Sequence, residues 1–347
     1  MATIRDVGKL AGVSVATVSR VINKKGYVSK ETEKAIINAM KMLNYTPNDV
    51  ARRLAGKKSN TIGLIIPNIL NPFFPEIARA AEDTANKLGF NLILCNSDNN
   101  REKENQYYEM LINKQVDGII IASYTATHMD LLSLMERNIP IVALDREYDG
   151  FDIPSIKADD RLGGELAAKH LVECGCRNIA HITGPMYIES FKERFEGFEK
   201  ILKENNIYDS QLIKIEEPSL KGGYEATKKL LEDKKTIDGI FAGNDILAIG
   251  CYKALNDLGY KLYDDIKLIG YDGLESNINY LEIYSVAQPM YNLGKCAVEL
   301  LIKRIKDEEL RIDLYIFTYS SFLILHFYSS FFSVFTWASS ALSGSML

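Results

Sequence analysis

The sequence predicts a small all-α head at the N-terminus, followed by a larger α/β body made of two lobes. Three observations support this prediction. The first 45 residues carry helix-capping residues and apolar residues at helical spacing. From Asn60 onward, short apolar runs alternate with helical patterns, which is typical of parallel sheets covered by helices on both faces. A chain of 347 residues is also long for one domain, so several units are expected.

Capping residues mark the helices of the head. Thr3 and Asp6 stand three positions apart ahead of an apolar run, a capping-box pattern that begins a first helix. Gly12 ends this helix, because a tight turn between two helices needs a residue that tolerates unusual backbone angles. Ser14 and Ser29 can cap a second and a third helix. Three short helices with one tight turn predict a helix-turn-helix unit.

The second helix holds the residues best placed to contact DNA. In a helix-turn-helix its N-terminal residues face base edges in the major groove, and here these are Val15, Ala16, Thr17 and Arg20. Arg20 can contact guanine through two hydrogen bonds or hold a phosphate, and both roles stay open. Val15 and Ala16 can read only shape or a thymine methyl group. The alternative interpretation is a three-helix domain that binds protein.

Charge is distributed unevenly along the chain and favours a head that binds nucleic acid. Residues 1–60 contain 12 Lys and Arg and 4 Asp and Glu, a net charge of +8. The rest of the chain contains 29 basic and 42 acidic residues, a net charge of −13. A basic head on an acidic body suits phosphate binding by the head alone.

A short segment after the head predicts a hinge helix. Residues 46–49 form a cap pattern with Pro47 at the first helical position, and Gly56 follows as a stop signal. A helix this short is marginal in water, so it would form only when something packs against it. Leu54, pushed between base steps in the minor groove, would supply that packing and kink the DNA. The alternative is a plain flexible linker.

These motifs resemble one family over a long stretch. Residues 3–23, TIRDVGKLAGVSVATVSRVIN, and residues 45–68, YTPNDVARRLAGKKSNTIGLIIPN, are similar to the lactose-repressor (LacI/GalR) family of bacterial transcription regulators. The resemblance extends to about Asp313. It implies that the two heads of a homodimer read a near-palindromic operator in double-stranded DNA. The DNA-binding residues expected on this basis are Thr3, Ser14, Val15, Ala16, Thr17, Ser19, Arg20, Asn23, Asn48, Arg52, Leu54 and Ala55.

Two successive sets of strands and helices predict the two lobes of the body. The expected strands are Thr61–Ile66, Asn91–Cys95, Gly118–Ala122 and Pro140–Leu144, then Ile179–Thr183, Leu212–Ile215, Gly239–Ala242 and Leu268–Tyr271. The chain is expected to cross between the lobes at residues 153–157 and 284–288, so that a helix over 290–306 returns to the first lobe. Such a hinged pair is similar to type I periplasmic binding proteins. The predicted domains are residues 1–45 for the head, 46–59 for the hinge helix and 60–313 for the body, with the first lobe at about 60–152 and 289–313 and the second at about 158–284.

Polar and aromatic residues stand where the strands of the body end. Ligands of open α/β sheets bind beyond the carboxyl ends of the strands. The candidates there are Asn71, Phe73, Phe74, Asp145, Arg146, Arg194, Asn244, Asp272 and Gln288. Aromatic rings can cover the apolar faces of a sugar, while carboxylate, amide and guanidinium groups bind its hydroxyls. The set resembles that of ribose-type binding proteins and repressors, although a further aromatic residue expected near Pro218–Gly223 cannot be identified.

Structural roles are alternatives for several of these candidates. The two phenylalanines could cap the core, and the two aspartates could be helix caps or turn residues. Asn244 followed by Asp245 fits a helix N-terminus, so one of them is expected to be a cap. The two arginines could form surface ion pairs.

The remaining motifs disfavour an enzyme and predict no cofactor or metal. The five cysteines lack metal-ligand spacing, the four histidines form no motif, and no GxGxxG follows a strand. We therefore predict a sugar-controlled repressor of carbohydrate-utilisation genes, cytoplasmic because no signal peptide precedes the head. The alternatives are a sugar-binding protein without a DNA role, and a regulator of the same family that responds to a purine or to a corepressor protein.

Residues 314–347 differ in composition from the rest of the chain, since they contain no Lys, Arg, Asp or Glu. Leu314–Trp337 has the length of a membrane span, although its Ser and Thr residues, His326 and the lack of a positive residue on the far side disfavour one. The interpretation that we adopt is a tail not native to the family, such as an out-of-frame end. Both interpretations leave open whether the last strand of the first lobe is present.

Overall fold

The computed structural model describes residues 2–22, 26–45, 59–232, 236–274, 283–306 and 314–317. The chain forms two compact units, Met1–Ser59 and Asn60–Leu347. Within these described ranges, no helix combines the length and the apolar character that crossing a membrane requires. Residues 318–347, which hold most of the uncharged tail, lie outside the described part.

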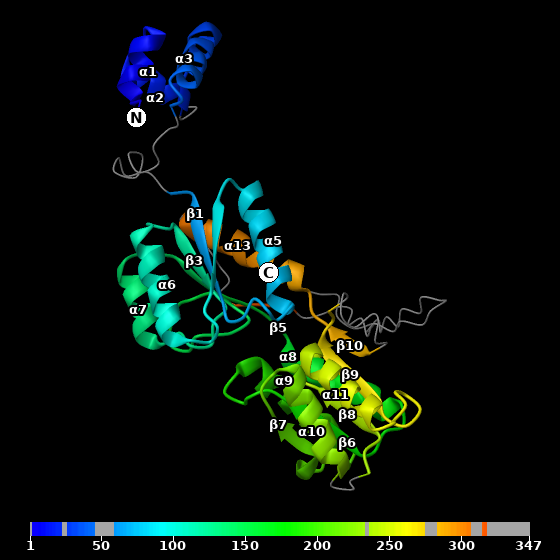
Figure 1. Cartoon of the computed structure of the whole chain (residues 1–347). Helices are drawn as coiled ribbons and strands as arrows, with labels where there is room; N and C mark the ends of the chain where they lie inside the picture. The colour runs from blue at the N-terminus through cyan, green and yellow to red at the C-terminus, as the bar shows by residue number, and fades with distance from the viewer. Residues whose placement is uncertain are drawn as a thin grey trace, which may run out of the picture. The chain divides into compact units, whose positions relative to one another are not determined.

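Three helices pack around a small apolar core in the head (Figure 1). They are α1 (Ile4–Ala11), α2 (Val15–Ile22) and α3 (Lys30–Met42). The core consists of Val7 from α1, Val18 from α2, and Ile36 and Ala39 from α3, all of them buried. The buried residues lie on one face of each helix, as an amphipathic pattern produces.

Local hydrogen bonds confirm the predicted caps of the head. Thr3 and Asp6 form a complete capping box, in which each side chain accepts a hydrogen bond from the backbone N–H of the other. Gly12 ends α1 with a left-handed φ of 68°. The side chains of Ser14 and Ser29 each accept a backbone N–H three residues on, at 3.1 and 3.2 Å, which begins α2 and α3.

Lobe 1 of the body is a six-stranded parallel sheet covered by helices on both faces (Figure 1). Its strands are β1 (Thr61–Ile66), β2 (Asn91–Asn96), β3 (Gly118–Ile121), β4 (Ile141–Leu144), β5 (Ser155–Ala158) and β11 (Leu314–Phe317), in the order β11-β5-β4-β3-β1-β2. Its helices are α5 (Phe73–Lys87), α6 (Arg101–Asn113), α7 (His128–Glu136) and α13 (Met290–Ile305). In β1, Ile62 and Leu64 pack with α5 and α13, whereas Ile65 packs with α6 and α7. This alternation is the period of two that a strand imposes.

Lobe 2 repeats this architecture with a five-stranded parallel sheet. Its strands are β6 (Ile179–Thr183), β7 (Ile213–Ile215), β8 (Gly239–Ala242), β9 (Lys267–Asp272) and β10 (Tyr284–Ala287), in the order β10-β9-β8-β6-β7. Its helices are α8 (Asp160–Glu173), α9 (Glu189–Glu204), α10 (Leu220–Glu232) and α11 (Asp245–Asp257), and a 3-10 turn, η1 (Ser210–Leu212), precedes β7. Helices α8 and α9 pack together, as do α10 and α11. The predicted fold class is therefore confirmed.

The chain passes between the lobes just after the two predicted segments, because residues 155–158 and 284–287 are themselves strands of the lobe that the chain leaves. β5 belongs to the sheet of lobe 1 and leads directly into α8 of lobe 2. β10 belongs to the sheet of lobe 2 and leads through Gln288 into α13 of lobe 1. Each crossing thus follows a strand of one lobe and ends in a helix of the other.

The start of the uncharged tail completes lobe 1. β11 pairs in parallel with β5, with Leu314 opposite Ser155 and Phe317 opposite Ala158. The last strand of the first lobe is therefore present. Sheet pairing uses backbone N–H and C=O groups, so the absence of charged residues does not prevent it.

Helices α8 and α9 approach each other so closely that only glycine fits at their contact. A Cβ on Gly164 would lie 2.0 Å from the carbonyl oxygen of Arg194, and a Cβ on Gly197 would lie 2.0 Å from that of Arg161. This contact places the first two turns of α8 beside the second and third turns of α9. It brings Asp160 within hydrogen-bond distance of Arg194, at 2.7 Å.

Candidate functional site

A cavity lies in the body where the carboxyl ends of strands from both lobes meet. Its volume is about 80 Å³, which is small beside the roughly 300–1,000 Å³ of sites for drug-sized ligands. The lining residues are Pro67, Asn68, Asn71, Phe73, Phe74, Asn99, Tyr124 and Asp145 before the first crossing, and Ile188, Ser190, Phe191, Arg194, Pro218, Asn244 and Asp272 after it. Seven of the nine sequence candidates are therefore brought together.

Arg194 is the buried cation of this cavity. Its Nε donates to Asp160 Oδ1 at 2.7 Å and its Nη1 donates to the carbonyl oxygen of Gly243 at 2.8 Å. The guanidinium lies 3.8 Å from the ring centroid of Tyr271 and 5.5 Å from that of Phe191. Burial disfavours the charged form, but the neighbouring carboxylates outweigh this effect and raise the pKa of Arg194 well above its usual value. Arg194 is thus a fixed cation, not a surface ion pair.

Asp145 follows β4 and carries an oxygen without a partner. Its backbone has a left-handed φ of 61°, which is unusual outside glycine. Its Oδ2 accepts a long hydrogen bond of 3.4 Å from the hydroxyl of Tyr124, and its buried Oδ1 has no partner. Burial and the nearby Asp160 raise the pKa of Asp145 to about 8, although the charge of Arg194 acts in the opposite direction. A buried acceptor without a partner beside a cavity is suited to a ligand hydroxyl.

Asp272 ends β9 and is tied to the second crossing. Its Oδ1 accepts a hydrogen bond of 2.8 Å from Gln288 Nε2 and lies 3.9 Å from Arg194 Nη1. Its φ is 119°, so the strand ends on strained backbone. Burial raises the pKa of Asp272 to about 6, while Arg194 and the hydrogen bond from Gln288 limit the rise.

Asn244 and Asp245 have different roles at the start of α11. Asn244 is the cap, since its Oδ1 accepts the N–H of Leu247 at 2.9 Å, which leaves its amide nitrogen for the cavity that it lines. Asp245 is fully buried and accepts the backbone N–H groups of Gly273 and Leu274 at 2.8 and 2.9 Å. Asp245 thereby holds the backbone that follows Asp272.

The aromatic side chains serve both the cavity and the core. Phe73 and Phe74 begin α5, meet edge to face at 5.0 Å between centroids, and are each 3% exposed. They line the cavity and also belong to the core of lobe 1, so the two roles suggested by the sequence coexist. Asn71 holds the start of the helix, because its Oδ1 accepts the N–H of Phe73 at 3.1 Å.

Two sequence candidates do not line the cavity. Arg146 donates to the carbonyl oxygen of Ser123 and lies 4.4 Å from the ring centroid of Tyr148. Arg146 Nε is buried without a hydrogen-bond partner, but the residue is not part of the cavity lining. Gln288 donates a hydrogen bond to Asp272, and its buried Oε1 has no hydrogen-bond partner. Within the described ranges, no cluster of three or more His, Cys, Asp or Glu could hold a metal ion.

Sequence reasoning missed two aromatic residues of the cavity. Phe191, from the second lobe, lies three residues before Arg194 and so on the same face of α9. It is not the aromatic residue expected near Pro218–Gly223, where Pro218 is the residue that lines the cavity. Tyr124 follows β3 in a loop that is held by hydrogen bonds to Glu104. This carboxylate is 1% exposed and accepts hydrogen bonds from Tyr108, Ser123 and Thr125. The helical spacing could have identified Phe191, whereas nothing local identifies Tyr124.

The head presents a second candidate surface at the start of α2. Ser14, Val15, Ala16 and Arg20 are exposed, and Val15 is 41% exposed although it is apolar. Of the other candidates, Thr3 is exposed, whereas Thr17 and Ser19 are half-buried. Free backbone N–H groups at a helix N-terminus favour a phosphate oxygen. Asn23, Asn48, Arg52, Leu54 and Ala55, and with them the predicted hinge helix, lie outside the described residues.

Comparison with known proteins matches both units. Residues 3–48 match the family model "Bacterial regulatory proteins, lacI family", and residues 59–324 match "Periplasmic binding proteins and sugar binding domain of LacI family". The second match continues past Asp313, where the resemblance was expected to end, so at least residues 314–324 belong to the family pattern.

Individual relatives extend over most of the chain. A ribose operon repressor of Halalkalibacterium halodurans is 45% identical over 89% of this chain and 92% of its own length. The crystal structure of the Lac repressor dimer bound to operator and the anti-inducer ONPF has a TM-score of 0.81 at 28% identity, covering 91% of this chain and 96% of that one. A LacI family regulator from Enterococcus faecium with bound ribose has a TM-score of 0.67 at 31% identity, covering 74% and 94%. The chain therefore belongs to the LacI family of bacterial transcription regulators, which bind DNA and are not enzymes.

Proposed function

We propose that the cavity binds an uncharged sugar, with ribose favoured, and that its occupancy controls repression by the head. One observation carries this proposal. A paired guanidinium, two carboxyl groups and four aromatic rings surround a single cavity, and one carboxylate oxygen in it has no protein partner. Hydroxyl groups can both donate to the carboxyl groups and accept from Arg194 and Asn244.

The charges of the cavity favour a sugar without phosphate. Arg194 is the cation of the lining, and its Nε and Nη1 are already bonded to Asp160 and the carbonyl of Gly243. Asp160 and Asp272 place two carboxyl groups against that one cation, at 2.7 and 3.9 Å from its nitrogen atoms. A phosphate group would bring further negative charge next to them, which is costly in a buried site.

The relatives support the same effector class. The Halalkalibacterium halodurans protein is named a ribose operon repressor, and the Enterococcus faecium regulator holds ribose. Ligand control of DNA binding requires that the sugar bind the DNA-bound and free forms with different affinity. Because these relatives are named repressors, we propose that the sugar binds the DNA-free form more tightly and so releases the protein from DNA.

Calorimetry of the full chain against a small panel tests the effector. We expect ribose to bind more tightly than xylose or glucose, and ribose 5-phosphate and hypoxanthine to give no heat. Binding of hypoxanthine in place of the sugars would replace the proposal by a purine-controlled regulator. Operator binding that is intact, with no response to any of these compounds, would favour control by a corepressor protein.

Arg20→Ala tests the contact surface of the head. We expect weaker operator binding by about 1–3 kcal/mol if Arg20 contacts a base, with relaxed specificity at one position. If it holds a phosphate, affinity should fall evenly across sequences, and the salt slope should drop by about 1. The measurement is a mobility-shift titration on operator and random duplexes at several salt concentrations. Lys34→Ala, on the exposed face of α3, is the matched control, and equal affinities of both variants would contradict the assigned role.

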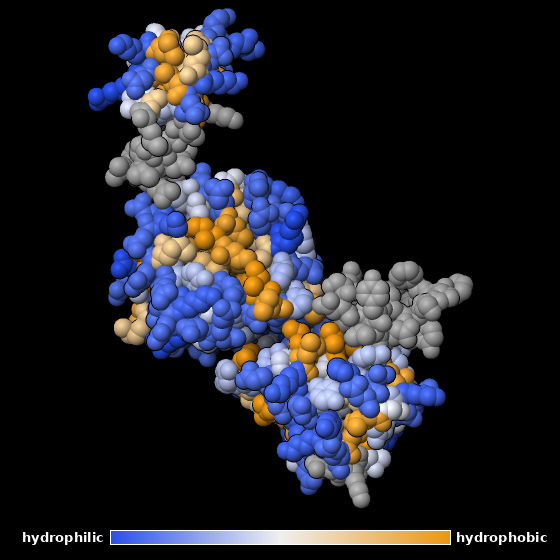
Figure 2. Space-filling view, in the orientation of Figure 1, coloured by the Kyte–Doolittle hydropathy of each residue, from blue (hydrophilic) through white to orange (hydrophobic). Residues whose placement is uncertain are grey.

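We further propose the organisation of the chain and its assembly. Residues 1–45 form the DNA-binding head, 46–59 the hinge helix, and the body starts at residue 60 and continues at least to β11. A homodimer would bury part of the apolar patch on lobe 1 that Figure 2 shows. Lobe 1 also exposes Leu70, Leu88 and Leu94. A regulator that binds an operator acts in the cytoplasm. Analytical ultracentrifugation that finds only monomer at micromolar concentration would contradict the dimer.

A further inference from the structure

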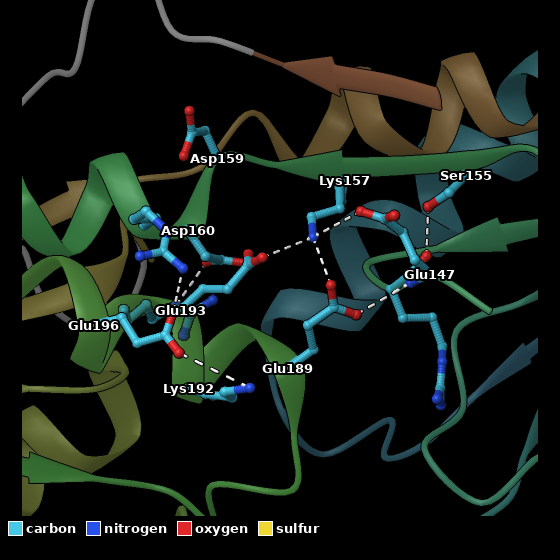
Figure 3. A network of polar contacts seen from close by, with 12 residues as sticks. Glu147, Ser155, Lys157, Asp159, Asp160, Glu189, Lys192, Glu193 and Glu196 are labelled. Carbon is cyan, nitrogen blue, oxygen red and sulfur yellow. Dashed lines mark hydrogen bonds and ion pairs between the residues drawn. The ribbon is translucent and has the colours of Figure 1, made fainter. Parts of the chain in front are cut away.

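Lys157 is a buried lysine shared by three carboxylates where the chain leaves lobe 1 (Figure 3). Its side chain is 6% exposed. Its Nζ lies 2.7 Å from Glu189 Oε1, 3.1 Å from Glu193 Oε1 and 3.1 Å from Glu147 Oε1. None of these four residues lines the cavity, so the proposed function does not use them.

The contacts of Lys157 join the two lobes. Lys157 is in β5 of lobe 1, and Glu147 follows β4 of the same lobe. Glu189 and Glu193 are on the first two turns of α9 in lobe 2. The backbone N–H of Glu147 also donates to Glu189 Oε2 at 3.2 Å. Glu189 therefore accepts hydrogen bonds from lobe 1 through both of its oxygens (Figure 3).

The segments that carry this cluster also carry the wall of the cavity. Glu147 lies two residues after Asp145, and Glu189 and Glu193 alternate along α9 with Ser190, Phe191 and Arg194. A movement of α9 away from the end of β4 would open the cavity. The same movement would stretch the ion pairs of Lys157, so the two events are mechanically linked.

One cation holds the cluster together against its own repulsion. Burial lowers the pKa of Lys157, but the hydrogen bonds and charges of Glu189, Glu193 and Glu147 outweigh it and raise that pKa above its usual value. Burial raises the pKa of Glu193 despite its ion pair with Lys157. Without the lysine, three carboxylates from two lobes would face one another with nothing between them. Removal of one partner from a buried ion cluster is far costlier than loss of a surface pair.

We propose that Lys157 is an interlobe latch, a positioning residue whose ion pairs to α9 hold the lobes in the arrangement that encloses the ligand. The latch sets the dissociation rate of the bound sugar. It also sets the fraction of the free protein whose lobes are already in the binding arrangement. This rests on the proposed function only for its effect on the sugar, because the contact itself exists without ligand.

Five forms of the full chain test the latch: the wild type, Lys157→Met, Lys157→Arg, Glu189→Gln and Lys200→Met. Lys200 is the matched control, since its Nζ lies 2.8 Å from Glu165 Oε1 and it is also on α9, but this pair joins α9 to α8 within lobe 2. Sugar affinity and dissociation rate are measured with ribose by calorimetry and stopped-flow competition. Hydrogen exchange of the Glu147 amide is measured without ligand.

We expect Lys157→Met to weaken ribose binding by about tenfold, mainly through faster dissociation, because a truncated buried charge pair acts chiefly on the off-rate. Glu189→Gln should act in the same direction but less strongly, and Lys157→Arg should restore affinity to within a few-fold. The Glu147 amide should exchange faster in Lys157→Met and Glu189→Gln than in the wild type. Lys200→Met should match the wild type in all three measurements.

Two results would overturn the latch. One is an unchanged exchange rate of the Glu147 amide in both Lys157→Met and Glu189→Gln. The other is a loss of affinity that Lys157→Arg does not restore or that Lys200→Met reproduces. If Lys157→Met fails to fold, Glu189→Gln carries the comparison alone. If the wild type binds no sugar, the proposed function fails, and hydrogen exchange still decides whether the latch exists.

Discussion

The two lobes contribute to the cavity in different ways. Lobe 2 presents groups that already have partners: Arg194 is bonded to Asp160 and Gly243, Asp272 is bonded to Gln288, and Asn244 caps α11. On lobe 1, Asp145 has one long hydrogen bond and an oxygen without a partner. Lobe 2 is therefore the pre-organised half of the site, and lobe 1 is the half that the ligand completes.

This difference indicates which substitutions should change ligand affinity alone and which should also change the stability of the fold. Removal of a group held by several buried partners lowers the free energy of unfolding, because those partners stay buried without a hydrogen bond or a counter-charge. A group with spare hydrogen-bonding capacity costs mainly ligand affinity. Substitutions in lobe 2 should thus damage both folding and binding, and substitutions in lobe 1 should separate the two.

Arg194→Met should have the largest effect. It leaves Asp160 and Asp272 buried without their cation, so the free energy of unfolding should fall by roughly 3–5 kcal/mol and ribose binding should be lost. Urea unfolding and calorimetry measure the two losses. Arg161→Met is the control, since Arg161 is 53% exposed and pairs with Glu196 on the surface, and it should cost less than about 1 kcal/mol. Equal stability of the two variants would refute the pre-organised role of lobe 2.

Asp145→Asn should change how stability depends on pH. The folded pKa of about 8 is above the ordinary value of 3.8, so the folded state binds the proton more tightly than the unfolded chain. The stability from this proton is complete below about pH 4 and is lost as pH rises through about 8. Asparagine tolerates the left-handed backbone and never ionises. The variant should therefore lose less stability than the wild type between pH 5 and 8, by roughly 1–3 kcal/mol.

Urea unfolding at pH 5, 6.5 and 8 measures this difference. Asp257→Asn is the control, since Asp257 is exposed and its hydrogen bond from Lys253 lowers its pKa. It should leave the slope with pH between 5 and 8 unchanged. A wild type and an Asp145→Asn variant with parallel pH profiles would show that Asp145 is ionised throughout this range.

Tyr124→Phe should have the smallest effect. It removes a hydroxyl whose hydrogen bond to Asp145 is 3.4 Å long, so we expect ribose affinity to fall by about threefold with unchanged stability. Calorimetry and thermal unfolding check both parts. Tyr260→Phe, at a partly exposed position after α11, should leave affinity unchanged. A large loss of stability in Tyr124→Phe would mean that lobe 1 is as pre-organised as lobe 2.

Much of the fold was predictable because its signals are local. Each buried strand is a short apolar run, and each helix of the head begins at a side chain that caps it. The carboxyl ends of strands could be read in the same way, which identified Asp145, Asn244 and Asp272. β11 was not predictable from composition, since its place in the sheet depends on pairing with β5 across more than 150 residues.

The rest of the site depends on where individual side chains point and on partners that are distant in the sequence. Asp145 and Arg146 are neighbours in sequence, but only Asp145 lines the cavity. The position of Tyr124 depends on Glu104, which lies on α6 and accepts hydrogen bonds from three hydroxyl groups, two of them beside Tyr124. The Lys157 cluster joins segments whose proximity appears only when both lobes are assembled.

The backbone at positions 145 and 272 limits how this receptor can be redesigned. Both residues have positive φ, at 61° and 119°, a region that most side chains avoid and that Gly, Asn and Asp occupy most readily. A library that randomises these positions to change ligand preference would therefore yield mostly misfolded members. New selectivity should be sought at Ser190, which lines the cavity from ordinary helical backbone.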